Sequence, residues 1–419
     1  MPLLLNAIRS QFPALKRPAI FLDNPGGTQV ARACVDRIQS YLYDMNANHG
    51  GHFATSRASD ASIEQAREIM ADFLNAASPN EIIFGANMTT LTFMMSRTLG
   101  QLFQPGETIV LTRLDHDANV SPWMLLARDL GLNVRFVDFR PEDGTLDLED
   151  LRRALEEHPR LVAFGYASNA LGTISPVEEI TRMAHEAGAL VYIDAVQYAP
   201  HGPIDVQKIG CDFLVCSAYK FFGPHLGALY GRLDLLESLP AYKVRPAPAE
   251  TPHKFETGTG NFEHMAGTLG ALEYLEWVGQ TFGEEYGELL AGAYSGRRLS
   301  LKQAMTAIHA YEVELNRELL AELNSVPGAR VYGITDPTKL DRRVPTFALT
   351  VEGFTPAEIA KRLDEYNIYT WDGNFYALEV TTRLGLEDKG GLLRIGATHY
   401  NTVEEIHQLG KALREIVGG

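Results

Sequence analysis

Short apolar runs alternate with helical stretches between residues 81 and 219, and this alternation restricts the fold more than any other feature of the chain. The runs are rich in β-branched and aromatic residues, as strands are: EIIFGAN (81–87), TIVLTRL (108–114), NVRFVDF (133–139), RLVAFGYAS (160–168), ALVYIDAV (189–196) and DFLVCSAY (212–219). Helical periodicity occupies most of the intervening segments, at 90–103, 118–131, 148–158 and 176–188. Alternating strands and helices predict an α/β fold with a mostly parallel sheet and helices on both faces.

The rest of the chain indicates further parts around this region. The first twenty residues have the pattern of a short helix ending at Pro18, and a Pro- and Gly-rich segment at 245–261 ends the alternation. A long helical pattern follows to about Asn324, and then strands and helices of a small α+β region. We expect an N-terminal segment (1–20), a large α/β domain (21–265), and a helical connection with a small C-terminal domain (266–419).

Charge and cysteine content limit the partners that we expect. The formal net charge of -16 disfavours nucleic acid and anionic membranes. Cys34, Cys211 and Cys216 form neither a Cys-x-x-Cys pair nor a disulfide framework, which is typical of a reducing compartment. With no secretory signal and no apolar stretch long enough for a bilayer, the sequence predicts a cytoplasmic protein.

Two polar residues follow neighbouring predicted strands. Asp194 ends the strand in LVYIDAVQ, and Lys220 comes just after the strand in FLVCSAYK. Carboxyl ends of parallel strands meet at one edge of the sheet, so both side chains should reach one crevice. There a lysine amine can form a Schiff base with pyridoxal 5′-phosphate (PLP), while a carboxylate pairs with the pyridine nitrogen. A surface lysine beside an unrelated strand-end aspartate is the alternative, but Tyr219, Phe221 and Phe222 around Lys220 argue against it.

Other segments are compatible with the same site. Met88 and Thr89 open a predicted helix after a strand, where backbone N–H groups can bind a phosphate; a helix cap is the alternative. His116 follows another strand and could stack on a flat ring, or it could belong to a capping loop with Asp115 and Asp117. His49 and His52 have His-x-x-His spacing, but no carboxylate completes a metal site, so we expect no metal.

With these residues in view, the chain resembles the cysteine desulfurase-like branch of the class V aminotransferase family. The resemblance runs from about Phe21 to Ile416. Its matching stretches are FLDNPGG (21–27), NANHGGH (46–52), DHDANVSPW (115–123), SNALGTISPVEEI (168–180), VYIDAVQYAPHGPIDVQKIGCDF (191–213), SAYKFFGPHLGALYG (217–231), FETGTGN (255–261) and LRIGATHYNTVEEI (393–406).

The resemblance implies a PLP enzyme of fold type I that forms a homodimer with active sites at the subunit interface. It implies that Lys220 forms the Schiff base, that Asp194 pairs with the pyridine nitrogen and that His116 stacks on the ring. It also implies that Gln197 contacts the ring hydroxyl, and that Asn169 and Arg394 bind the substrate α-carboxylate. The phosphate contacts that it implies are Met88, Thr89, Ser217, Tyr219 and Thr259, with Thr259 donated by the other subunit. His52 is expected to line the substrate entrance. Asn169, Gln197 and Arg394 could instead be turn, strand-end or surface residues.

The sequence departs from the family pattern at two positions. Tyr219 stands where the Ser-x-His-Lys motif usually has histidine, and a tyrosine can still donate one hydrogen bond to a phosphate. Tyr376, in WDGNFYALEV, stands where desulfurases have a nucleophilic cysteine, and no cysteine follows Cys216. A phenol cannot accept sulfur as a persulfide, because that step needs a thiolate. Tyr376 is therefore expected to contact the substrate.

Three functions follow as hypotheses. The first is a lyase for C–S cleavage or another β-elimination, in which Lys220 takes the α-proton of an amino acid. The second is an aminotransferase or an amino-acid epimerase. The third is a non-catalytic protein on the same fold.

Overall fold

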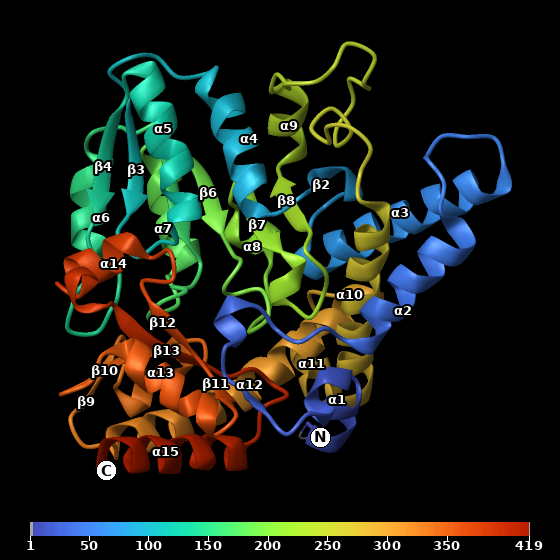
Figure 1. The fold of residues 1–419 in the computed structure, drawn as a ribbon. Helices are drawn as coiled ribbons and strands as arrows, with labels where there is room; N and C mark the ends of the chain where they lie inside the picture. Colours follow the sequence, from blue (N-terminus) through green and yellow to red (C-terminus); the bar gives the residue numbers. More distant parts are fainter. Residues whose placement is uncertain (1–2, 419) are drawn as a thin grey trace.

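A seven-stranded sheet forms the centre of the larger part of the molecule. The computed structural model describes residues 3–418. The strand order is β2-β8-β7-β6-β5-β3-β4 (Figure 1). The bounds are β2 Ile82–Gly85, β3 Thr108–Thr112, β4 Asn133–Val137, β5 Leu161–Gly165, β6 Leu190–Asp194, β7 Phe213–Ser217 and β8 Gly227–Gly231. Strands β3 to β7 pair in parallel, whereas β8 runs antiparallel to both β7 and β2. The expected α/β fold with a mostly parallel sheet is confirmed.

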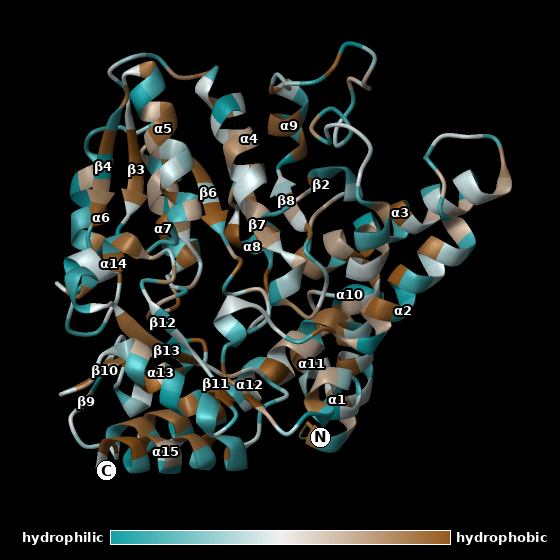
Figure 2. Cartoon of the chain, in the orientation of Figure 1, coloured by the Kyte–Doolittle hydropathy of each residue, from teal (hydrophilic) through white to brown (hydrophobic). Residues whose placement is uncertain are grey.

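Helices cover both faces of this sheet because alternate strand residues point to opposite sides. Ile109 and Leu111 pack against the helices on one face of the sheet, and Val110, which lies between them, packs against the helices on the other face. The first face is covered by α4 Met88–Gly100, α5 Ser121–Leu130 and α9 Leu233–Ser238. The second is covered by α6 Leu148–Leu155, α7 Val177–Glu186 and α8 Val206–Ile209, with long helices beyond them. Brown, apolar strands lie between helices with teal outer faces in Figure 2. Apolar residues on both faces thus bury the strands from either side.

Long helices connect this part to the C-terminal region. They are α10 Phe262–Phe282 and α12 Gly296–Asn324, and α3 Ala54–Leu74, which precedes the sheet in the chain, packs against both. Shorter helices accompany them: α1 Leu5–Ser10, α2 Arg32–Ser40 and α11 Gly287–Leu290. Helices α2 and α3 project as an arm at the right of Figure 1. Exposed apolar side chains lie on this arm, including Leu42, Tyr43 and Phe53.

A second sheet of four antiparallel strands lies in the C-terminal region, with the order β12-β13-β10-β9. The bounds are β9 Ala329–Tyr332, β10 Thr346–Val351, β12 Trp371–Gly373 and β13 Leu392–Gly396. Its helices are α13 Pro356–Glu365, α14 Leu378–Arg383 and α15 Val403–Gly418. The N-terminal segment joins this region, because β1 (Ile20–Phe21) pairs with β11 (Ile368–Tyr369).

The sequence analysis missed one strand of the large sheet. Residues 227–231, GALYG, form β8, whose glycines weakened the strand pattern. Gly227 is required there, because a Cβ atom would lie 2.5 Å from the carbonyl carbon of Asn87. The expected N-terminal helix is shorter than its pattern, since α1 ends at Ser10 and a 3-10 turn, Pro13–Lys16, follows. The division of the chain at residues 20 and 265 stays a prediction.

No helix within residues 3–418 is long and apolar enough to cross a membrane.

Candidate active site

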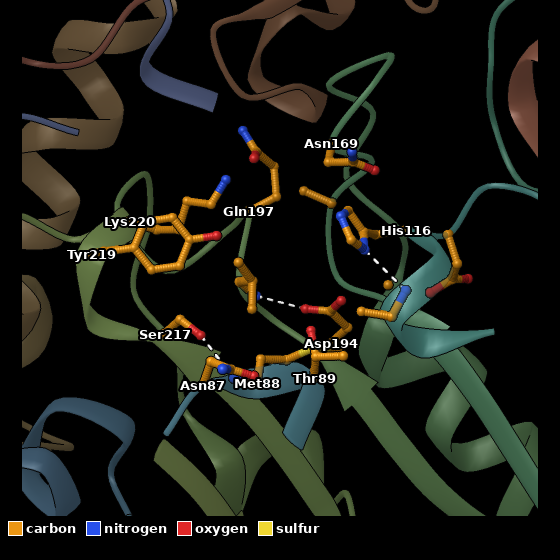
Figure 3. Close-up of a pocket in the computed structure, with 15 residues that line it drawn as sticks. Asn87, Met88, Thr89, His116, Asn169, Asp194, Gln197, Ser217, Tyr219 and Lys220 are labelled. Carbon is orange, nitrogen blue, oxygen red and sulfur yellow. Dashed lines mark hydrogen bonds between the residues drawn. The ribbon is translucent and has the colours of Figure 1, made fainter. Parts of the chain in front are cut away.

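A cavity lies at the carboxyl ends of the parallel strands, at the edge of the sheet that faces the small domain (Figure 3). It contains about 560 Å3 of space free of protein atoms, part of it open to solvent. Nine of the residues singled out from the sequence line it: Met88, Thr89, His116, Asn169, Asp194, Gln197, Ser217, Tyr219 and Lys220. The polar residues come from different strand ends, as expected for parallel strands that share one edge.

Lys220 enters the cavity from a short 3-10 helix, Ala218–Lys220, directly after β7. Its side chain is buried, and its Nζ donates a hydrogen bond to the carbonyl oxygen of Pro25. Burial lowers the pKa of this amine to about 7; the positive charge of Arg394 acts in the same direction, and Asp194 opposes it. A large fraction of the amine is therefore neutral near pH 7, which makes it a nucleophile and a base.

Asp194 ends β6, the strand that pairs with β7. The carboxylate is buried and accepts a hydrogen bond of 2.9 Å from the Val196 N–H. Burial raises the pKa of Asp194 to about 6, while the Val196 hydrogen bond and the charge of Lys220 lower it. Asp194 thus presents a buried carboxylate that gains from a cationic partner.

His116 caps a one-turn helix, and its Nδ1 accepts a hydrogen bond of 3.0 Å from the Ala118 N–H. An accepting Nδ1 leaves the proton of the neutral ring on Nε2. Burial, together with the charges of Lys220 and Arg394, lowers the pKa of His116 to about 4. The ring is therefore neutral at pH 7. Tyr376 stacks on it, with ring centroids 5.5 Å apart.

One end of the cavity is suited to an anion. Met88 is the first residue of α4, and its N–H donates a 3.0 Å hydrogen bond to the Ser217 hydroxyl. Asn87 caps this helix by accepting from the Thr90 N–H at 2.9 Å. Backbone N–H groups at a helix N-terminus and a neighbouring hydroxyl can bind a phosphate, here in exchange for the Met88–Ser217 hydrogen bond.

Asn169 and Arg394 meet on the small-domain side. The Nη1 of Arg394 donates to the Asn169 carbonyl at 3.0 Å, and the Asn169 Nδ2 donates to the Phe375 carbonyl at 2.8 Å. Within the described chain, three buried polar atoms here have no hydrogen-bond partner: Asn169 Oδ1, Gln197 Oε1 and Arg394 Nε. Buried polar atoms without partners are rare and call for a ligand or water.

These residues fit the cofactor predicted from the sequence. A phosphate fits the Met88 and Ser217 end, a pyridine nitrogen suits the Asp194 carboxylate, and an aldehyde suits the Lys220 amine. The unpaired amide oxygen of Gln197 can accept from a ring hydroxyl, and Arg394 has donors left for a carboxylate.

Not all of the predicted residues line the cavity. His52 and Thr259 are exposed and lie outside it. Arg394 does not line the cavity, but it donates a hydrogen bond to Asn169, which does. Tyr376, with 73% of its surface exposed, stacks on the outer face of His116. No group of three His, Cys, Asp or Glu side chains among residues 3–418 is arranged to hold a metal ion.

Sequence reasoning missed Asp115, which also lines the cavity. It was considered only as part of a capping loop beside His116. The signal that could have found it is its place three residues after the end of β3, as Lys220 lies three residues after the end of β7.

Comparison with known proteins gives consistent matches along the chain. A sequence model described as aminotransferase class-V matches residues 20–302 and 297–409. A cysteine desulfurase of Synechococcus elongatus is 33% identical over 99% of this chain, which spans 64% of that protein's length. An aminotransferase-like protein, FGM3, of Gibberella zeae is 34% identical, with 98% of each chain covered. The apo structure of a cysteine desulfurase from Thermococcus onnurineus superposes with a TM-score of 0.88 at 27% identity, covering both chains completely.

Proposed function

The chain belongs to the class-V aminotransferase family and is a PLP-dependent enzyme, and from this premise we propose that it is a lyase that eliminates the β-substituent of an α-amino acid. One observation carries the choice of reaction. A buried lysine with a lowered pKa shares its cavity with Asp194, whereas every cysteine of the chain is a buried thiol. The site therefore has the base that an elimination needs and lacks a thiolate that could accept sulfur.

The cysteines support this choice. Burial raises the pKa of Cys34 to about 12, and it also raises the pKa of Cys211 and Cys216. Cys216 lies on β7, and the negative charge of Asp194 raises its pKa further. A thiol with a raised pKa is inert as a nucleophile. Tyr376, which the family resemblance places where desulfurases have their nucleophilic cysteine, has its phenol ring stacked on His116.

The chain's own groups have distinct tasks in this proposal. Lys220 would hold the cofactor covalently, the Asp194 carboxylate would accept a hydrogen bond from the protonated ring nitrogen and keep it protonated, and His116 would cover a ring face. Gln197 takes the ring hydroxyl. Met88, Thr89, Ser217 and Tyr219 hold the phosphate, and Asn169 and Arg394 hold the substrate α-carboxylate.

PLP, when bound, draws electrons from the α-carbon of the substrate. The Lys220 amine, once free, accepts the α-proton, and the β-substituent leaves with the electron pair of its bond. Hydrolysis of the unsaturated product gives a keto acid and ammonia. For cysteine the products are pyruvate, ammonia and sulfide, with no net oxidation or reduction.

Two subunits complete the site in this proposal. Thr259 of one subunit is proposed to reach the phosphate in the other, because it is exposed and does not line its own cavity. The apolar side chains on the α2–α3 arm, such as Tyr43 at 78% exposure, are suited to burial in such an interface.

A second candidate is transamination. The match to a protein named aminotransferase-like, over 98% of both chains, favours it. Lys220 would then return the proton to another carbon instead of allowing a group to leave. Epimerisation, with proton return to the opposite face, uses the same residues.

Product analysis separates these reactions. We expect the PLP-loaded protein to release a keto acid and ammonia from at least one member of a panel that contains cysteine, cystine and serine derivatives with good leaving groups. Alanine formed from cysteine, with sulfur retained on the protein, would contradict the lyase proposal. Keto acid that appears only when a second keto acid is added as acceptor would indicate transamination.

Replacing Arg394 tests the carboxylate contact. Arg394→Gln should raise KM by about 10- to 150-fold with a smaller change in kcat, since a hydrogen bond to a charged group contributes about 1.5–3 kcal/mol. The control is Arg343→Gln, because Arg343 is also buried but donates to the carbonyls of Leu171, Ile334 and Thr346 outside the cavity. Equal KM values for both variants would show that Arg394 does not bind substrate.

A further inference from the structure

The DHDANVSPW stretch contains more polar residues than the proposed function uses. His116 is assigned to the cofactor, but Asp115, Asn119 and Trp123 of the same stretch have no role so far. All three are buried, at 3%, 0% and 0% exposure. A buried carboxylate needs hydrogen-bond donors, so its partners indicate what it does.

Asp115 is bonded on both sides of the loop that presents His116. Its Oδ2 accepts from the hydroxyl of Thr112, the last residue of β3. Its Oδ1 accepts from the Asn119 Nδ2 at 2.9 Å. Asn119 is itself held, since its Oδ1 accepts from the Trp123 indole N–H at 3.2 Å in α5. A chain of hydrogen bonds thus runs from the strand end through Asp115 into the helix, and His116 lies between its anchor points.

The carboxylate of Asp115 also lies against the strand that neighbours Asp194. A Cβ atom on Gly165 would be 3.2 Å from Asp115 Oδ1, and Gly165 pairs with Asp194 across β5 and β6. A larger residue at 165 would push against the Asp115 carboxylate. Burial raises the pKa of Asp115 to about 7, with the negative charge of Asp194 acting in the same direction.

We propose that Asp115 is a positioning residue, whose carboxyl group clamps the loop between Thr112 and Asn119 and so holds the His116 ring in the cavity. The proposal rests on the assignment of His116 to the cofactor. Without the clamp, the ring can turn toward solvent, away from the positive charges of Lys220 and Arg394 that oppose its protonation. Tyr376 on the outer face, the Ala118 N–H that donates to Nδ1, and the neighbouring Asp117 also lie beside the ring.

Histidine NMR of the cofactor-free protein tests the clamp directly. The His116 signal, assigned by its loss in His116→Asn, should titrate near pH 4 in the unaltered protein. Asp115→Ala should move this midpoint toward the ordinary value of about 6.5. Asp115→Asn should restore it, because an amide can still bond Thr112 and Asn119 with its two polar atoms. PLP binding, followed by titration, should weaken about 2- to 12-fold in Asp115→Ala through loss of ring contact.

Asp117→Asn is the matched control, since Asp117 flanks His116 on the other side but accepts only from the Ser121 hydroxyl through its side chain. It should leave the His116 midpoint and PLP affinity unchanged. An unshifted midpoint in Asp115→Ala, or the same shift in Asp117→Asn, would overturn the proposal. If Asp115→Ala does not fold, Thr112→Val removes one arm of the clamp, and an unshifted midpoint there also overturns it. A protein that shows these shifts but binds no PLP would refute the proposed function and leave the clamp intact.

Discussion

Lys220→Ala should abolish covalent retention of PLP and lower kcat by about 10²- to 10⁴-fold or more, the usual contribution of a catalytic base. The physical reason is the buried amine, whose pKa burial lowers to about 7. Alanine removes both the group that bonds the cofactor and the group that accepts the α-proton. Borohydride reduction of the PLP-loaded protein, followed by mass spectrometry of its peptides, measures covalent attachment independently of turnover.

Lys302 provides a matched control within the same protein. It is as buried as Lys220, and burial also lowers its pKa to about 7. Its Nζ donates to the carbonyls of Phe73 and Ile204, neither of which lines the cavity. Reduction should therefore label Lys220 and leave Lys302 unlabelled. Reduced cofactor found on Lys302, or full turnover by Lys220→Ala, would show that Lys220 is not the lysine that bonds PLP.

Glu256→Gln should lower the free energy of unfolding by up to about 3–5 kcal/mol, because it removes the charge that pairs with the buried Arg67, whose side chain is 2% exposed against 15% for Glu256. The Nη1 and Nη2 atoms of Arg67 donate to the two Glu256 carboxylate oxygens at 2.8 and 3.0 Å. The same carboxylate accepts from the Phe84 N–H at 2.8 Å. The pair thus joins α3 and β2 to the segment that carries Thr259, so the variant should also loosen that segment. Urea unfolding at a fixed protein concentration measures the loss.

The effect should depend on pH in a defined direction. Hydrogen bonds and the charge of Arg67 lower the pKa of Glu256 to about 2, from an ordinary value of 4.5. The carboxylate therefore stabilises the fold fully above about pH 4.5 and progressively less as the pH falls toward 2. The difference between the two proteins should shrink in acid.

Glu273→Gln is the control for this pair. Arg37 and Glu273 form a similar two-bond contact, but their side chains are 40% and 33% exposed. Exposed pairs contribute about 0–1 kcal/mol, so the variant should change the unfolding free energy little. If Glu256→Gln and Glu273→Gln lower the free energy of unfolding equally, burial does not explain the contribution of the Arg67–Glu256 pair to stability.

The arrangement of the cavity could be predicted from sequence for residues at or just beyond the carboxyl end of a strand. Asp194 is the last residue of β6, Lys220 lies three residues after β7, and Asn169 lies four residues after β5. A parallel sheet brings such positions to one edge whatever the intervening helices contain. The apolar runs were sufficient to place these strands. The strand β8, GALYG, was not predicted, because glycines weaken a strand pattern.

Other contacts of the site join residues that no local pattern relates. Arg394 and Asn169 are 225 positions apart, and Asn169 and Phe375 are 206 apart. Their meeting depends on how the small domain packs against the sheet edge. The ring of Tyr376 over His116 depends on the same packing, and on positive φ angles of 56° and 58° at Phe375 and Tyr376. Positive φ at non-glycine residues costs energy and is not foreseeable from residue type.

The sequence by itself determined the α/β fold and which strand ends carry the amine and the carboxylate, because the periodicity of apolar residues is a local property of the chain. Only the tertiary structure decided that β8 runs antiparallel to β2, that Tyr376 stacks on His116, and that Phe375 accepts a hydrogen bond from Asn169. Those features arise from contacts between distant segments, whose geometry is set by the packing of whole elements.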